Sequence, residues 1–309
     1  MTKKSKKQLV AYCKSYIGDL KRVKNLISSF LKYNNSNIDF YLSVPKKDIN
    51  HFADLIKDNK FAINLVLDED IIKLCSNEIG MLNYKKWDGR LSQQVLKILF
   101  AKYIKKKKIY ADNYLILDSE CTFTKKFSVS DFLYNNEVPF TVMYENIDHV
   151  KNLPKFKKRK ILYDLEKEAF FFKKIYNRQG PNYQFSPVPV VWSCKVIEDL
   201  YEKFLSKKNI DIWDFIASYS SELYVYGETL LHFESIPIKP VKPFFKVYHY
   251  DIQYEIEKKS LNKNNNDDFF GFLKQSSWDF ENDFGDQITR KSYLSKKYKK
   301  LKRFLYKFL

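Results

Sequence analysis

The chain has 309 residues, of which 45% are hydrophobic, and this is enough apolar material for the packed core of one large domain. Gly and Pro number only 7 and 9, which argues against a fibrous or low-complexity chain. The net charge is +18, but residues 290–309 hold nine Lys or Arg and residues 3–7 hold four Lys. The remainder of the chain therefore carries only +5, and a chain-wide nucleic-acid surface is not implied.

Cysteine usage and hydropathy point to a cytoplasmic protein. The four cysteines are far apart and form no C-x-x-C pair, which favours reduced thiols over a disulfide framework or a zinc site. No run of about 18 apolar residues is present, so we expect no transmembrane helix. The opening residues MTKKSKKQLV are charged and lack the apolar stretch of a secretory signal.

The first 125 residues alternate between predicted strands and helices. Strands are expected over 8–15, 39–44, 61–67 and 114–117, and helices over 19–33, 46–59 and 91–104. Short strands separated by helical segments are typical of βαβ units. The pattern therefore predicts an α/β fold with a mostly parallel sheet flanked by helices.

Beyond Lys125 the alternation becomes irregular. Strand-like pieces at 138–144 and 187–193 are interspersed with predicted helices at 159–176 and 195–206. Residues 261–268, LNKNNNDD, read as a polar loop.

Two acids follow the strand predicted at 114–117, in the sequence YLILDSECTF. Ligands of parallel α/β sheets bind at the carboxyl ends of the strands, and extended backbone would point Asp118 and Glu120 the same way. Carboxylates so placed can hold Mg²⁺ or Mn²⁺ against a diphosphate. The alternative is that Asp118 caps the next turn and Glu120 is a solvated surface acid.

The context of these acids resembles a known group of enzymes. The segment GRLSQQVLKILFAKYI, followed by YADNYLILDSECTF, is similar to bacterial GT-A glycosyltransferases of the capsule and lipopolysaccharide type. It is more closely similar to an uncharacterised family of predicted bacterial glycosyltransferases. The segments NIDFYLSVPKKDINHF and SSELYVYGETLL agree with further blocks of that family, so the resemblance spans residues 8 to 235. The matching residues are Trp87, Gly89, Gln93, Gln94, Lys97 and Asp118-Ser119-Glu120.

The resemblance implies a GT-A-like, Rossmann-like fold that moves a sugar from a nucleotide-sugar donor to a hydroxyl of a cell-surface glycan or lipid-linked glycan. Residues 1–125 would form the donor-binding half and 126–260 the acceptor-binding and catalytic half of one domain. An irregular segment, 261–289, and a tail, 290–309, would follow. The familiar metal-binding triplet is D-x-D, and Glu120 departs from it, so dependence on Mn²⁺ or Mg²⁺ through Asp118 and Glu120 is an expectation to be tested.

The resemblance also suggests which residues contact the donor. Ser15, Tyr16 and Asp19 follow the first strand and would meet the nucleotide, although Asp19 is equally suited to cap the next helix. Residues 90, 94 and 97 share one helix face, which would look towards the donor diphosphate or lie in solvent. Within this face, Gln94 and Lys97 are better candidates than Arg90.

Glu222 is the candidate catalytic base that takes the acceptor's proton, which implies inversion, although a retaining enzyme could use the same carboxylate differently. The alternative is a role in the first turn of a helix after Ser221. Tyr226-Gly227 would form a tight turn beside it. Trp192 and Trp213 are candidates to stack on a sugar or to lie in the core. A further metal ligand would be His232 or His249, and the sequence selects neither.

The last twenty residues form a basic amphipathic pattern. Leu294, Tyr298, Leu301, Leu305 and Phe308 recur at spacings of three and four among the nine cations. We expect a helix that lies on the anionic inner face of the membrane. Packing against the domain or binding RNA are the alternatives.

Two other functions compete with glycosyl transfer. A nucleic-acid-binding protein would use the +18 charge, but that charge is concentrated at the termini, and no nucleic-acid partner is expected. A nucleotidyltransferase on a related fold typically carries a Gly-rich phosphate loop after the first strand, where this chain has SYIGD.

Overall fold

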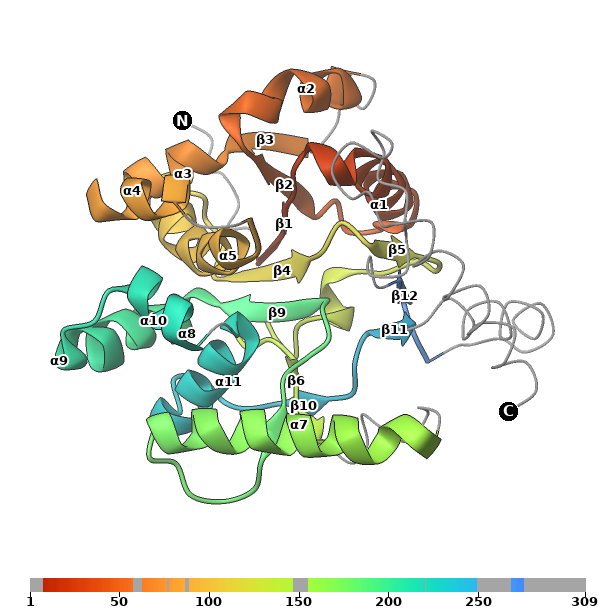
Figure 1. Cartoon of the computed structure of the whole chain (residues 1–309). Coiled ribbons are helices and arrows are strands. Elements are labelled where there is room, and N and C mark those ends of the chain that lie inside the picture. The colour runs from red at the N-terminus through yellow and green to blue at the C-terminus, as the bar shows by residue number, and fades with distance from the viewer. Residues whose placement is uncertain are drawn as a thin grey trace, which may run out of the picture.

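Five strands form the central sheet of the molecule (Figure 1). The computed structural model describes residues 8–57, 63–76, 78–86, 89–146, 155–219, 221–248 and 268–274. The first four strands run parallel, and the fifth is antiparallel to its neighbour. The predicted α/β fold with a mostly parallel sheet is confirmed. In spatial order the strands are β3 (Ile63–Leu67), β2 (Asp39–Val44), β1 (Leu9–Lys14), β4 (Asn113–Leu117) and β9 (Val190–Ser193).

Helices cover both faces of this sheet. Alternate residues of a strand point to opposite faces, and the ring contacts follow that rule. Tyr12 of β1 stacks on Phe100 at a centroid distance of 3.9 Å, whereas Phe40 of β2 meets Phe30 edge-on at 5.0 Å. The first contact belongs to α5 (Gly89–Lys106) and the second to α1 (Leu20–Tyr33), so these helices lie on opposite faces. Further helices on this half are α2 (Ile49–Lys57), α3 (Asp68–Cys75) and α4 (Glu78–Lys86).

Among the described residues, three small sheets, separate from the central one, are formed by short strands. The strand β5 (Cys121–Phe123) pairs antiparallel with β12 (Gly271–Lys274), which pairs parallel with β11 (Phe245–Tyr248). Two smaller ladders join β6 (Thr141–Val142) to β10 (Pro240–Val241) and β7 (Tyr144–Glu145) to β8 (Tyr183–Gln184). The strand expected over 138–144 is thus divided into β6 and β7.

The later helices pack near the edge strand β9 and below it in Figure 1. The helix expected over 159–176 is present as α7 (Lys155–Ile175). The helix expected over 195–206 is interrupted by a π-helical turn over Leu200–Leu205. The other members of this group are α8 (Cys194–Asp199), α9 (Ser206–Lys208), α10 (Ile212–Tyr219) and α11 (Glu222–Phe233).

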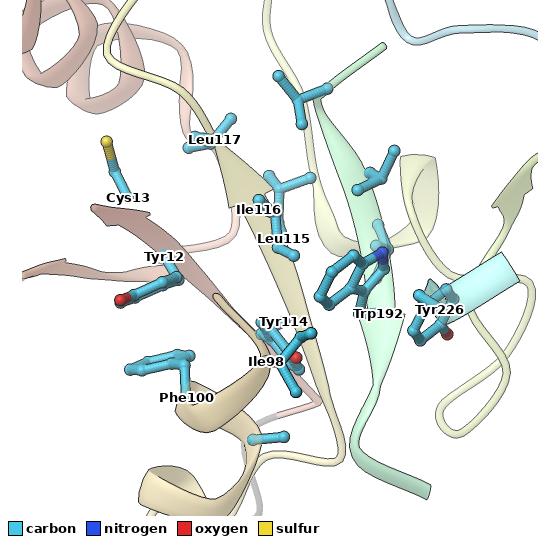
Figure 2. Close-up of a cluster of buried hydrophobic side chains, with 14 of the residues drawn as sticks. Tyr12, Cys13, Ile98, Phe100, Tyr114, Leu115, Ile116, Leu117, Trp192 and Tyr226 are labelled. Carbon is cyan, nitrogen blue, oxygen red and sulfur yellow. The ribbon is translucent and has the colours of Figure 1, made fainter. Parts of the chain in front are cut away.

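An aromatic chain of contacts ties α5, β4, β9 and α11 together (Figure 2). The hydroxyl of Tyr114 on β4 donates to the backbone carbonyl of Lys97 on α5 at 3.1 Å. Tyr114 meets Trp192 of β9 edge-on at 6.0 Å, and Trp192 stacks on Tyr226 of α11 at 4.7 Å and 3°. The Tyr226 hydroxyl accepts a hydrogen bond from the backbone N–H of Ser193 at 2.9 Å. These buried contacts fasten α11 to the sheet.

The fold decides between two alternatives and corrects one expectation. Trp192 and Trp213 are fully buried, so of the two alternatives they lie in the core. Gly227 makes no turn but lies within α11, where the ring of Phe185 packs so closely that an added Cβ would be 2.3 Å from it. Close approach of this ring to the helix backbone explains the glycine.

Other expectations fall outside the described residues. These are Trp87, His249, the tail 290–309 and the loop 261–268 except for Asp268. Within the described ranges, none of the helices combines the length and apolar character needed to cross a bilayer. The four cysteines are free, and burial raises the pKa of Cys13, Cys75, Cys121 and Cys194 above the ordinary thiol value.

Candidate functional site

The candidate site lies at the carboxyl ends of β1 and β4. The chain proceeds from β1 outward through β2 and β3 and then returns to place β4 on the other side of β1, so the strand order reverses between β1 and β4. Such a reversal is where doubly wound sheets bind their ligands. Here the segments after the two strands touch, because the Ser119 hydroxyl donates to Oδ2 of Asp19 at 3.0 Å.

Lys97 stands at the centre of this site. Its Nζ lies 2.9 Å from Oδ1 of Asp118 and 2.9 Å from Oε1 of Glu222. The side chains of Lys97 and Glu222 are 5% and 11% exposed, and that of Asp118 is 35% exposed. One ammonium therefore joins a carboxylate at the end of β4 to a carboxylate at the start of α11. We call Gln94, Lys97, Asp118 and Glu222 the Lys97 cluster.

The electrostatic balance of the cluster keeps Lys97 charged. Burial by itself lowers the pKa of a lysine because it disfavours the charged form. The carboxylates of Asp118 and Glu222 outweigh this effect and raise the pKa of Lys97 above its ordinary value. The cluster thus holds a permanent cation beside two acidic side chains.

Gln94 positions the start of α11. Its Oε1 accepts the backbone N–H of Glu222 at 3.2 Å, and its Nε2 donates to the carbonyl of Arg90 at 3.3 Å. The first N–H groups of a helix have no intrahelical acceptor, so Gln94 satisfies one of them. Ser221 precedes the helix but makes no capping hydrogen bond with its side chain. Arg90 is exposed.

The residues expected to contact the nucleotide follow β1. Ser15 is buried, its backbone N–H donates to the carbonyl of Ser43 at 2.9 Å, and its Oγ finds no partner among the described residues. Tyr16 is exposed, and its ring packs over Gly18. Asp19 precedes α1 but makes no capping hydrogen bond, because its carboxylate instead pairs with Arg22 and accepts from Ser119.

The backbone after β4 differs from the expected extended strand. The N–H of Cys121 donates to the carbonyl of Asp118 at 3.0 Å, so residues 118–121 form a tight turn that leads into β5. The inference that extended backbone aligns Asp118 with Glu120 is therefore wrong. Glu120 is half-buried in this turn.

The donors present are nevertheless of the right chemistry for a divalent cation. The ion pair with Lys97 uses Oδ1 of Asp118, and carboxylate oxygens are the ligands that Mg²⁺ and Mn²⁺ prefer. Within the part of the chain that the structure describes, no three His, Cys, Asp or Glu residues are grouped as metal ligands, and the exposed His232 joins no such group. A cation here would share its coordination with substrate oxygens.

A second buried polar group lies along the same edge and was missed by the sequence reasoning. Asp68 follows β3, its Oδ2 lies 3.5 Å from Nζ of Lys14 at the end of β1, and it accepts the Tyr84 hydroxyl at 3.0 Å. Burial raises the pKa of Asp68, and Lys14 opposes that rise. The sequence pattern that could have identified Asp68 is an acid directly after a strand, which is also the pattern at Asp118.

Comparisons with known proteins place this chain in a family. A family model described as "Family of unknown function (DUF6492)" matches residues 9–287, and the chain therefore belongs to this family. No curated protein matches the sequence.

Two solved structures are similar to parts of this one. Mouse xyloside xylosyltransferase 1, in its apo form, has a TM-score of 0.48 and 7% identity, with coverage of 87% of this chain and 98% of that chain. The apo structure of the WbbM bifunctional glycosyltransferase has a TM-score of 0.45 and 8% identity, with coverage of 86% of this chain and 45% of that chain.

Proposed function

We propose that this member of the DUF6492 family is a glycosyltransferase, which moves a sugar from a nucleotide-sugar donor to a hydroxyl of a glycan or lipid-linked glycan. One observation carries the proposal. At the point where the strand order reverses, the Lys97 ammonium lies 2.9 Å from both Asp118 and Glu222. Inverting sugar transfer uses a positive charge beside the departing diphosphate and a carboxylate beside the acceptor hydroxyl, and the Lys97 cluster contains both groups.

Lys97 would stabilise the leaving group. As the bond between the anomeric carbon and the phosphate oxygen breaks, its electron pair passes to the diphosphate, whose negative charge grows. A buried ammonium directed at that oxygen stabilises the transition state more than the ground state. We propose that Asp118 and Glu120 would also hold Mg²⁺ or Mn²⁺, which would neutralise the diphosphate when bound.

Glu222 would act on the acceptor. In our proposal its carboxylate accepts the hydroxyl proton as the acceptor oxygen forms its bond to the anomeric carbon. A single displacement of this kind inverts the anomeric configuration. Gln94 serves this step by fixing the backbone of Glu222.

The segment after β1 would bind the donor nucleotide. Ser15 brings a buried hydroxyl oxygen that has no partner among the described residues, and a ligand group would satisfy it. Tyr16 offers an exposed ring in the same segment, and Asp19 is held against Ser119 next to Asp118. These three residues would place the nucleotide beside the Lys97 cluster.

The biological setting is a further part of the proposal. The sequence resemblance supports an acceptor of the bacterial capsule or lipopolysaccharide type. The nine cations and the apolar stripe of residues 290–309 support attachment to the inner face of the membrane.

Donor binding and transfer test the proposal separately. UDP- and GDP-sugars, with and without Mn²⁺, should raise the melting temperature of the wild-type chain and be consumed with a glycan acceptor. Glu222→Gln should still bind donor but lose about 10²- to 10⁴-fold in transfer rate. Glu234→Gln, at the other end of the same helix, is the matched control and should keep wild-type activity. A wild-type chain that binds none of the nucleotide sugars would refute the proposal.

A further inference from the structure

The helix α7 exposes aromatic side chains at the rim of the molecule. In Figure 1 it lies along the lower edge, and no described helix or strand lies below it, although the loop that leads from it to β8 passes there. Tyr163, Phe170 and Phe171 are 67%, 56% and 44% exposed. They are three of seven large hydrophobic residues found exposed in the described part of the chain, so this one helix concentrates almost half of them.

Of these three rings, Phe171 contacts Tyr219 of α10 at 5.4 Å, so it contributes to packing within the domain. The inner side of the helix stacks Phe172 on Tyr224 of α11 at 5.1 Å and 7°. Tyr176, just beyond the helix, stacks on Phe204 at 4.2 Å and its hydroxyl lies 2.9 Å from that of Thr229. Packing against the domain therefore leaves Tyr163 and Phe170 unexplained.

Lysines share the outer face with the rings. Tyr163 and Phe170 are seven residues apart and so project from the same side of the helix. Lys167 and Lys174 each lie four residues after one of these rings and share that side. Both lysines are exposed, and Nζ of Lys173 lies 5.9 Å from the Phe170 ring centre. Over residues 155–175 the sequence has eight Lys or Arg against three acids. We call Tyr163, Lys167, Phe170 and Lys174 the outer face of α7.

We infer that the outer face of α7 docks on the surface of an anionic lipid bilayer. Aromatic rings favour the boundary between headgroups and acyl chains, and lysines are drawn to anionic headgroups. An exposed helix on which rings and ammonium groups alternate can bind the headgroup–acyl boundary and the anionic headgroups together. The inference depends neither on sugar transfer nor on residues 290–309.

Docking through α7 would orient the candidate site. The stack of Phe172 on Tyr224 joins α7 to α11, and α11 begins with Glu222. The part of the molecule that carries the proposed base would thus be the part held nearest the bilayer.

Vesicle co-sedimentation of the full chain tests the inference. Vesicles of phosphatidylcholine with and without phosphatidylglycerol are compared for the wild type, Tyr163→Ser/Phe170→Ser and Lys167→Glu/Lys174→Glu. Each double variant should bind anionic vesicles about tenfold more weakly than wild type. Tyr110→Ser, which changes an equally exposed ring, and Lys47→Glu/Lys207→Glu, which changes the same charge on other surfaces, should bind like wild type.

Direct contact is tested with a fluorescent side chain. Phe170→Trp should gain emission that brominated anionic lipid quenches, whereas the added emission of Tyr110→Trp should be unaffected. Wild-type vesicle affinity in both α7 double variants, or an unquenched tryptophan at position 170, overturns the inference. Equal losses in the α7 variants and their controls would also overturn it, because they would indicate a response to total charge or hydrophobicity.

Discussion

The Nζ of Lys97 and Oε1 of Glu222 lie 2.9 Å apart in the folded chain, although 125 residues separate them in the sequence. Replacing Lys97 by Met should leave the largely buried carboxylate of Glu222 without its counter-ion. We expect the free energy of unfolding to fall by about 3 kcal/mol, the lower part of the range for broken buried pairs, because Asp118 remains partly hydrated. Urea denaturation measures this change. The double variant Lys97→Met/Glu222→Gln should recover part of the lost free energy of unfolding. A double variant no more stable than Lys97→Met would contradict a direct coupling between the two side chains.

Gly227 should tolerate no side chain. Gly227→Ala places a Cβ 2.3 Å from the Phe185 ring, and overpacking of this kind costs about 1–3 kcal/mol. The helix propensity of Ala returns about 1 kcal/mol, so a net loss remains. Gly89→Ala is the matched control, because nothing lies within 4 Å of its added Cβ. Thermal unfolding should show a lower melting temperature for Gly227→Ala and an unchanged or higher one for Gly89→Ala.

Arg178 should be essential to the stability of the segment that precedes β8. It binds both carboxylate oxygens of the fully buried Glu228, with Nη2 at 2.9 Å from Oε1, and also donates to the carbonyls of Gln179 and Pro181. Arg178→Met should lower the free energy of unfolding by about 3–5 kcal/mol, since it strands a buried carboxylate. Adding Glu228→Gln to Arg178→Met should restore much of the lost free energy of unfolding. Equal stability of the two variants in urea would show that the pair is not coupled.

Asp68 should make the free energy of unfolding depend on pH in the acid range. Because burial raises its pKa, the folded chain keeps this proton to a higher pH than the unfolded chain does. Stability from this group is therefore present at low pH and declines as pH rises through the ordinary carboxyl value, about 4, and up to the raised value. Asp68→Asn lacks that decline, so its stability relative to wild type should grow as the pH rises above about 4. Urea titrations at several pH values measure the difference, and Asp214→Asn, at an exposed site, is the control.

Metal binding should depend on Asp118. In the presence of a nucleoside diphosphate we expect the wild-type chain to bind Mn²⁺, detected by the loss of the free-ion electron paramagnetic resonance signal. Asp118→Asn should weaken that binding by about tenfold or more, since it removes a charged oxygen ligand. Asp214→Asn serves again as the control. A wild-type chain that leaves the Mn²⁺ signal unchanged would contradict the proposed metal site.

Local pattern was sufficient for most of the central sheet. The strands β1, β2, β3 and β4 are short apolar runs between helical segments, and such runs are read directly from the sequence. The resemblance to a glycosyltransferase family singled out Gln94, Lys97, Asp118 and Glu222. Nothing in their spacing showed that one ammonium would serve two carboxylates, because that contact depends on how α11 packs against α5.

The errors have physical causes in neighbouring structure. Asp118 and Glu120 were read as extended backbone, but the hydrogen bond from Cys121 closes a turn that a list of residues does not reveal. Gly227 suggested a turn because glycine usually marks one, whereas here the Phe185 ring requires its missing side chain. The pairing of Asp68 with Lys14 cannot be seen in the sequence, because the two residues come together only when β1 and β3 join the same sheet.

The contacts around Lys97 close a ring through the interior. From the Lys97 carbonyl the path runs to Tyr114, Trp192 and Tyr226, then along α11 to Glu222, and the ion pair returns it to Lys97. The spacing of the charged groups is therefore set by the size of buried rings and not by surface loops. A change confined to a surface loop should therefore leave the distance between the ammonium and the carboxylate unaltered. Trp192 contacts rings and no charged group, yet a smaller residue at this position should change the distance between Lys97 and Glu222.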